Sequence, residues 1–192
     1  PLSVAHHDLL GDIEMNFTDT INPNVDVLFL CLGHGKSISF LENNQFSEAT
    51  KIIDLGNDFR LIKDKDFNGK SFVYGLPELN KADIKNAQYI ANPGCFATAI
   101  QLALLPLAAD GLLSEDVHIN ATTGSTGAGV GLAATSHFSW RNNNFSHYKV
   151  FEHQHLGEIN QSIKQLQADY TDELIFVANR GDFPRGIFAT LY

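Results

Sequence analysis

The sequence has few cysteines, little positive charge and no long apolar run, and each of these absences narrows the function. Only Cys31 and Cys95 occur among 192 residues, so a disulfide framework is excluded and a reducing compartment is expected. Lysine and arginine together number 13 against 22 acidic residues, a formal net charge of −9. This balance leaves no excess of cations for a nucleic acid or an anionic membrane surface. No apolar run approaches the ~18 residues of a membrane span.

The first ten residues, PLSVAHHDLL, lack the basic region and the apolar stretch of a targeting signal. We therefore expect a cytoplasmic protein whose partners are small molecules rather than nucleic acid or membrane. The hydrophobic content is sufficient for a packed core, because 44% of the residues are hydrophobic and 18% are charged. The composition is typical of one globular domain or two small ones.

The first half of the sequence has the spacing of a β-α-β unit. Residues 25–32 form a near-continuous apolar run that ends at Gly33, which is typical of a parallel strand buried on both faces. Cys31 lies inside this run, and we expect it to be a small buried side chain with a structural role. A helix, a strand, a loop and another strand are expected to follow at 36–48, 51–55, 57–75 and 88–91.

The second half has a mixed pattern. Apolar residues recur at helical spacing from Phe96, and this helix is expected to be interrupted near Pro106 and to stop at Gly111. Strands are expected at 117–121, 174–177 and 186–191, with a helix at 156–166. Because the sequence ends at Tyr192 within a strand pattern, we expect a portion of a longer chain. The predicted fold class is α/β, with an incomplete Rossmann-like parallel sheet and a second α+β layer.

Cys95 is the strongest candidate for chemistry. It follows Asn-Pro-Gly at the end of a predicted strand and begins the next predicted helix. Unpaired backbone N–H groups and the positive end of the helix dipole favour an anion at this position and so stabilise a nucleophilic thiolate. The carboxyl end of a parallel sheet is also where ligands bind in doubly wound folds. A packed structural cysteine would give the same local pattern.

Five segments together resemble the motifs of one known family. They are IANPGCFATAIQLALLP at 90–106, DLGNDFR at 54–60, YGLPELN at 74–80, GSTGAG at 124–129 and HQH at 153–155. The first matches, position for position, the active-site signature of N-acetyl-gamma-glutamyl-phosphate reductases, and the others follow in family order. The resemblance extends over nearly the whole chain.

The resemblance implies a two-domain enzyme of the aspartate-semialdehyde dehydrogenase superfamily. Residues 1–113 would be a remnant of the NADP-binding Rossmann-like domain that ends in the helix of the catalytic cysteine. Residues 114–192 would form an incomplete α+β catalytic and dimerisation domain. In the implied reaction, NADPH reduces N-acetyl-gamma-glutamyl phosphate to the semialdehyde in arginine biosynthesis, and phosphate is released. Cys95 would attack the acyl phosphate and carry a thioester, and the enzyme would be a homo-oligomer.

His153 and His155 are the candidates for proton transfer, because collapse of a hemithioacetal needs a group that moves protons near pH 7. Both precede the predicted helix, in whose first turn Glu158 complements the dipole. His155 adjoins the helix start, and the resemblance also assigns catalysis to the second histidine, which leaves His153 for substrate binding. Solvated surface histidines stay open as an alternative. So does a metal site formed by the two histidines with Glu158, although no further cysteine, histidine or carboxylate stands at a short ligand spacing.

The resemblance further implies a set of binding residues. For the cofactor they are Gly33, His34, Asn92, Gly127 and Ala128, and for the substrate Arg60, Ser125, Arg141 and His153. The small residues and free N–H groups of 122–129 suit a phosphate or a nicotinamide ring, although a plain flexible turn would have the same composition. An arginine fork suits a phosphate or a carboxylate, and a structural salt bridge is the alternative for Arg60.

Some positions depart from the family pattern. The family commonly has arginine where this chain has Val130, and arginine and proline where it has Gln154 and Gly157. The Gly-x-x-Gly-x-x-Gly fingerprint that opens the Rossmann domain of the family is absent, as is its C-terminal Lys-Gly-Ala-Ala-Gly-Gln-Ala helix. We therefore expect weak NADP binding by this chain alone, because the pyrophosphate normally rests on the helix that follows the fingerprint.

Three rival functions remain. Aspartate-semialdehyde dehydrogenase shares the mechanism, but its signatures around the cysteine and the histidine fit less well. A Cys-His thiol hydrolase would use the same pair of side chains without a nicotinamide. A catalytically silent interaction piece is the third.

Overall fold

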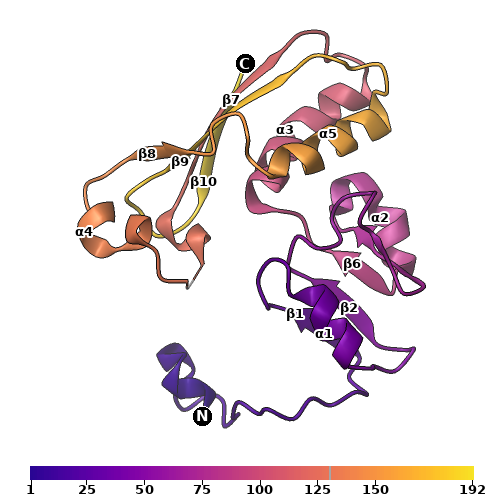
Figure 1. Cartoon of the computed structure of the whole chain (residues 1–192), viewed down its shortest axis with the longest axis vertical. Helices are drawn as coiled ribbons and strands as arrows, with labels where there is room; N and C mark the ends of the chain where they lie inside the picture. Colours follow the sequence, from indigo (N-terminus) through magenta and orange to yellow (C-terminus); the bar gives the residue numbers. More distant parts are fainter. Residues whose placement is uncertain (130) are drawn as a thin grey trace.

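The computed structural model describes residues 1–129 and 131–192, and Val130, one of the departures from the family pattern, lies outside the described residues. Two four-stranded sheets organise the chain (Figure 1). Two short 3-10 helices, η1 (Leu2–Val4) and η2 (His7–Leu9), precede them. This N-terminal segment lies apart from both sheets, as the indigo end of the ribbon in Figure 1 shows.

The first sheet is wholly parallel, with the strand order β1-β2-β6-β5. Its strands are β1 (Val27–Leu30), β2 (Lys51–Asp54), β6 (Tyr89–Ala91) and β5 (Val73–Tyr74). Helix α1 (Ser37–Asn43) connects β1 to β2, which confirms the predicted β-α-β unit. The predicted loop at 57–75 is wrong in part, because it contains β5 and the hairpin of β3 (Asp66–Phe67) and β4 (Lys70–Ser71). Helix α2 (Pro77–Asn86) was not predicted.

Strand β1 departs from the expected burial. Only Leu30 is buried, whereas Val27 and Phe29 are 43% and 59% exposed. The reason is that β1 is an edge strand, and the side of it that carries these two residues is not covered by other described residues. Cys31 lies one residue beyond the strand and is exposed, so the prediction of a buried cysteine is wrong.

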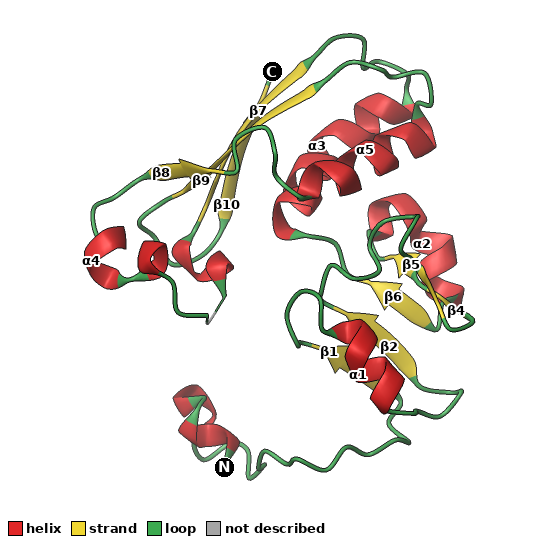
Figure 2. Cartoon of the chain, viewed as in Figure 1, coloured by secondary structure: helices red, strands yellow, loops and turns green. Residues whose placement is uncertain are grey.

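The second sheet is mixed, with the strand order β10-β7-β9-β8. Its strands are β7 (Val117–Thr123), β8 (Ser146–Tyr148), β9 (Leu174–Arg180) and β10 (Ile187–Leu191). β7 and β9 are parallel, and the edge strands are antiparallel to their neighbours. Residues alternate between buried and less buried along β7, as predicted for a strand with one wet face. Figure 2 shows the short helical turns η3 (Ser125–Ala128), η4 (Ala134–Ser136) and α4 (Phe138–Arg141) gathered at one end of this sheet.

Helices α3 (Cys95–Ala109) and α5 (His155–Leu166) pack against each other beside the second sheet (Figure 1). Helix α3 continues through Pro106, so the predicted interruption is wrong. Burial of Leu104, Leu105 and Ala108 holds the helix on both sides of the proline. Helix α3 shares its apolar core with β7, β9 and α5. The expected domain boundary at residue 113 therefore separates α3 from the sheet against which it packs.

Candidate active site

Cys95 stands where the first sheet meets helix α3. The parallel strands β1, β2 and β6 end at one edge of the sheet, and their loops carry residues 31–35, 55–60 and 92–94. Gly94 has extended backbone and precedes the helix, and the first helical hydrogen bond runs from the Thr98 N–H to the Gly94 carbonyl at 2.8 Å. Cys95 is therefore the first residue of the helix, where backbone N–H groups lack intrahelical partners. Its side chain is exposed.

His155 lies directly beside the residue that precedes the cysteine. A Cβ atom at Gly94 would collide with the Nε2 atom of His155, so a glycine is required for the imidazole to come this close. The histidine begins α5 and is only 5% exposed. Burial lowers its pKa to about 4, with smaller contributions from Arg60, His34 and Lys149. The ring is neutral at pH 7 and can accept a proton there.

His153 packs against the same imidazole. The two ring centroids are 4.7 Å apart, and the Nδ1 atom of His153 accepts a hydrogen bond from the N–H of His155 at 3.3 Å. Phe96, Tyr148 and Phe176 surround the ring of His153. Burial lowers its pKa to about 4 as well. The structure thus places both histidines inside the protein, and the alternative of solvated surface histidines is wrong.

Glu158 connects these parts, whereas the sequence suggested for it a role in the helix dipole or as a ligand in a metal site. Its carboxylate is buried at 3% exposure. It accepts hydrogen bonds from the Gly94 N–H at 2.8 Å, from the Tyr74 hydroxyl at 2.8 Å and from Arg60 at 3.1 Å. One of its oxygens also lies 3.9 Å from the Nε2 atom of His155. The i,i+3 spacing from His155 was the signal in the sequence that could have identified it.

Arg60 is fully engaged inside the protein. It is 5% exposed, and its guanidinium donates to Glu158, to the Asn92 carbonyl at 2.8 Å and to the Leu55 carbonyl at 3.0 Å. These bonds tie the loop after β2 to α5 and to the end of β6. The structure favours the structural salt bridge that the sequence left open over the expected contact with substrate.

Arg141 is also held by the protein itself. It is 4% exposed and donates to the Arg180 carbonyl at 2.8 Å and to the Ser146 Oγ atom at 2.9 Å. These bonds join α4 to β8 and β9 at the far end of the second sheet. The expected substrate role is therefore corrected to that of a structural brace.

An open depression of about 460 Å³ lies over Cys95. Its other lining residues come from α3, from the end of β7 and from the loop before β10: Thr98, Ala99, Leu102, Thr123, Gly124, Thr126, Gly127, Arg185, Gly186 and Ile187. Cys95 and Gly127, both predicted site residues, thus share one surface. Ala128 and Ser125 belong to the same short turn η3.

Five of the six N–H groups in the loop at 124–129 already have acceptors, contrary to the free donors that were expected for phosphate. The N–H groups of Gly124, Ser125 and Thr126 donate to carbonyls of residues 183–186. Those of Gly127 and Gly129 donate within the loop. The expected phosphate nest is therefore wrong for these residues, because packing against the segment before β10 uses their donors.

The remaining predicted cofactor residues lie at the edge of the first sheet. Gly33 and Gly35 both have positive φ, and His34 between them is exposed. The Gly35 N–H donates to the Asp58 carboxylate at 2.9 Å. Asn92, just after β6, is exposed too. The structure brings these residues to the same edge as Cys95.

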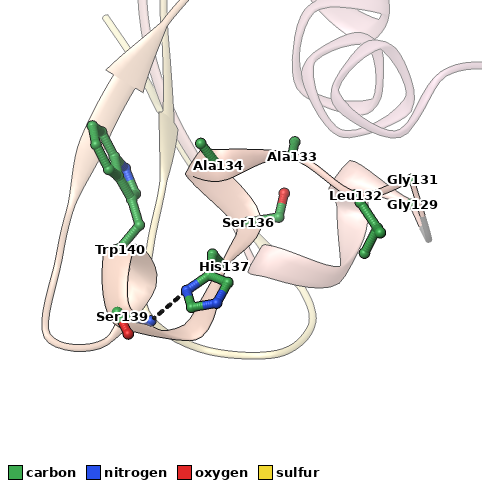
Figure 3. Close-up of a pocket in the computed structure, with 9 residues that line it drawn as sticks. All are labelled: Gly129, Gly131, Leu132, Ala133, Ala134, Ser136, His137, Ser139 and Trp140. Carbon is green, nitrogen blue, oxygen red and sulfur yellow. Dashed lines mark hydrogen bonds between the residues drawn. The ribbon is translucent and has the colours of Figure 1, made fainter.

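A larger depression, about 810 Å³, lies away from this chemistry (Figure 3). Residues between Gly129 and Trp140 line it, and His137 is the one titratable side chain among the described lining residues. The Nδ1 atom of His137 accepts a hydrogen bond from the Ser139 N–H, drawn as a dashed line in Figure 3, and so caps α4. Among the described lining residues, neither the Ser136 nor the Ser139 hydroxyl forms a hydrogen bond with His137 that would activate it as a nucleophile.

Within residues 1–129 and 131–192, no group of three or more His, Cys, Asp or Glu side chains is arranged to hold a metal ion. None of the helices in the described part of the chain is both long enough and apolar enough to span a bilayer.

Two family models match the chain. The semialdehyde dehydrogenase, NAD binding domain, matches residues 2–87, and the semialdehyde dehydrogenase, dimerisation domain, matches residues 95–192. Together they leave out only Pro1 and the short segment 88–94, which contains β6 and Asn-Pro-Gly. The match confirms the predicted fold class.

Curated relatives with high sequence identity to this chain share a single name. The chain is 79% identical over its 192 residues to the N-acetyl-gamma-glutamyl-phosphate reductase of Flavobacterium johnsoniae, of which it covers 59%. It is 56% identical over 189 residues to the protein of the same name from Bacteroides fragilis, of which it covers 57%. The chain thus spans less than two thirds of these relatives, and the resemblance seen in the motifs is confirmed.

Solved structures share the fold. Aspartate semialdehyde dehydrogenase II from Vibrio cholerae superposes with a TM-score of 0.59 at 15% identity, over 87% of this chain and 55% of that one. The enzyme from Candida albicans, solved with NADP, gives a TM-score of 0.52 at 12% identity over 87% and 49% of the two chains. At these identities the likeness concerns the fold alone.

Proposed function

Because the chain belongs to the semialdehyde dehydrogenase family, we propose that it forms part of an NADPH-dependent N-acetyl-gamma-glutamyl-phosphate reductase of arginine biosynthesis in the cytoplasm. One observation carries the proposal. An exposed cysteine begins α3, and the buried, neutral His155 lies against the glycine that precedes it. The name of relatives that are 56–79% identical supports the choice of substrate.

The chemistry follows from the position of Cys95. Its thiolate, favoured by the start of α3, attacks the acyl carbon, so a C–S bond forms, the C–O bond to phosphate breaks and phosphate leaves. Transfer of a hydride to the thioester carbon, with uptake of one proton by its oxygen, would then give a hemithioacetal on the same sulfur. His155, which is neutral at pH 7, accepts the hydroxyl proton as the hemithioacetal collapses, the C–S bond breaks and the semialdehyde departs.

The edge of the first sheet suits a nicotinamide cofactor. Gly33 and Gly35 have φ of +86° and +74°, and Cβ atoms added to them would meet no other atom within 4 Å. This open glycine turn lies at the carboxyl end of β1, on the edge where doubly wound sheets bind dinucleotides. We propose that Gly33, His34 and Asn92 border the cofactor from this side, with Gly127 and Ala128 opposite. When bound, NADPH supplies the hydride that reduces the thioester carbon.

We also propose that the protein is a homo-oligomer that associates through its second half. The match of residues 95–192 to a dimerisation domain supports this. The face of the second sheet opposite the helices also exposes an apolar side chain, Phe188, at 72%.

The test of the function is a coupled assay in the reverse direction with the full-length enzyme. N-acetylglutamate semialdehyde, NADP and phosphate should give NADPH absorbance at 340 nm, and omission of phosphate should abolish it. Aspartate semialdehyde serves as the control substrate. In a separate incubation with N-acetyl-gamma-glutamyl phosphate and NADPH, hydrolysis of the acyl phosphate without any nicotinamide signal would instead indicate a Cys-His hydrolase. Preference for aspartate semialdehyde would overturn the assignment of substrate.

A further inference from the structure

Among the described residues, Arg185 is the one charged side chain that lines the depression over Cys95. Its guanidinium takes part in no ion pair or side-chain hydrogen bond within the described residues. By contrast, the buried Arg60 and Arg141 each donate to protein acceptors. In a chain with a net charge of −9, this cation, which lines the same depression as the candidate nucleophile, is therefore available to an external anion.

The other donors of the depression are already used. The hydroxyl of Thr98 donates to the Gly94 carbonyl at 3.0 Å, that of Thr123 to the Gly124 carbonyl at 3.3 Å and that of Thr126 to the Pro184 carbonyl. The backbone N–H groups of residues 124–127 and 129 already donate to backbone carbonyls. An anion that enters the depression thus meets one free side-chain donor group, the guanidinium.

The backbone that carries Arg185 is fixed on both sides. The preceding Pro184 carbonyl accepts from both the N–H and the hydroxyl of Thr126, and the following Gly186 carbonyl accepts from the Gly124 N–H at 3.0 Å. Gly124 packs so closely that a Cβ atom there would lie 2.6 Å from the backbone nitrogen of Arg185. A fixed backbone reduces the entropy lost when the guanidinium binds a ligand.

We propose that Arg185 binds the phosphoryl group of the acyl phosphate, an assignment that rests on the proposed function. The phosphoryl group is attached to the carbon that Cys95 attacks, so it must enter the same depression as the sulfur. A guanidinium fork matches two phosphoryl oxygens and neutralises charge on the departing phosphate. In the reverse reaction the same residue holds inorganic phosphate beside the thioester.

Reverse-direction kinetics with the full-length enzyme test this role. Arg185→Ala should raise the KM for inorganic phosphate about tenfold or more, with the KM for NADP unchanged. The phosphate KM of Arg185→Lys should lie between those of the wild type and Arg185→Ala. Lys164→Ala is the matched control, because it removes an exposed cation of α5 that does not line the depression. A phosphate KM equal to that of the control would overturn the proposal. A rise confined to the KM of the semialdehyde would also overturn it, since Arg185 would then bind the substrate carboxylate.

Alkylation of Cys95 gives a readout that does not need reductase activity. The reagents are the anion iodoacetate and the neutral iodoacetamide, with Cys31, exposed and outside the depression, as an internal reference. Arg185→Ala should lower the ratio of iodoacetate to iodoacetamide reactivity several-fold at Cys95 but not at Cys31, and phosphate should slow alkylation of the wild type only. An unchanged ratio would contradict a free cation beside Cys95. A changed ratio in a protein without reductase activity would support the anion site and count against the proposed function alone.

Discussion

At the scale of single residues, the site depends on a cysteine in contact with solvent and a histidine that is shielded from it. In the proposed mechanism the exposed Cys95 meets the acyl phosphate, whereas His155 is held by packing beside Gly94. Its pKa of about 4 means that the ring is unprotonated at neutral pH and so can act as a base but not as an acid. The sequence analysis expected a group that titrates near pH 7, and burial is the physical reason for the difference.

The two histidines should separate in kinetics. His155→Asn should lower kcat by the ~10²–10⁴ typical of a lost acid-base group, whereas His153→Asn should act mainly on KM. In the wild type, kcat/KM should stay level down to pH 6 and fall on the acid side near the pKa of about 4. Steady-state rates of both variants across pH check this. A larger loss of kcat for His153→Asn would reverse the assignment.

Residues differ in how far the sequence predicts them. Cys95 was predictable because strand, glycine, cysteine and helix are contiguous in the chain. The bond between Arg60 and Glu158 was not, because 98 residues separate the two partners and no local pattern links them. The unpaired Arg185 was missed for a related reason, since only the folded loop brings it to the depression over Cys95.

At the scale of elements, α5 fixes the start of α3. Glu158, one turn into α5, accepts the N–H of Gly94, the residue that caps α3, and pairs with Arg60 from the loop after β2. Three elements from distant parts of the chain thus converge on one buried carboxylate. The geometry around Cys95 depends on this convergence as well as on the local backbone.

Glu158→Gln should therefore destabilise the fold and impair catalysis together. The change leaves the cation of Arg60 buried without a charged partner, and breaking a buried pair typically costs about 3–5 kcal/mol in the free energy of unfolding. Urea denaturation followed by circular dichroism measures it. Glu152→Gln is the control, because Glu152 is exposed and belongs to no ion pair among the described residues. Equal stability of the two variants would show that the buried carboxylate is not a structural centre.

Helices and strands were predictable where they were long enough for the apolar residues to repeat at a recognisable spacing. The twelve-residue helix α5 and the seven-residue strands β7 and β9 carry clear apolar spacing, so their existence followed from the sequence. Strand β5 did not, because two residues give no period. The interruption expected at Pro106 was wrong because tertiary packing of α3 outweighs the local cost of proline.

At the scale of the whole molecule, two apolar cores lie on either side of the site. One holds the first sheet with Phe59 and Phe72, and the other joins α3, α5 and the second sheet. The α/β class followed from the sequence, but the sharing of α3 with the second core did not. That packing depends on contacts of Ile100, Ile159 and Ile163 between helices that are far apart in the chain.

Burial of both histidines makes stability depend on pH. The pKa of each is about 4 in the folded protein, against an ordinary histidine pKa of 6.5 in the unfolded chain. Between these values the unfolded chain binds more protons, so the free energy of unfolding is undiminished above pH 6.5 and falls as pH drops toward 4. Each histidine contributes up to ~1.4 kcal/mol per pH unit in that window. Asp54, whose pKa is raised by burial, acts in the opposite direction.

Urea midpoints at pH 7, 6 and 5 measure this dependence. The midpoint should decrease with pH in the wild type and change less in a double variant with His153→Asn and His155→Asn. Equal slopes for the two proteins would show that other groups control acid stability.

The central claim is that Cys95 carries the acyl group, and intact-protein mass spectrometry after rapid acid quench tests it most directly. Mixing the full-length enzyme with N-acetyl-gamma-glutamyl phosphate in the absence of NADPH should add one N-acetylglutamyl group, located by peptide mapping at Cys95, with release of stoichiometric phosphate. Cys95→Ser should show no adduct, and Cys31→Ser should acylate as the wild type does. An adduct that persists in Cys95→Ser, or phosphate release without any adduct on the wild type, would contradict the account.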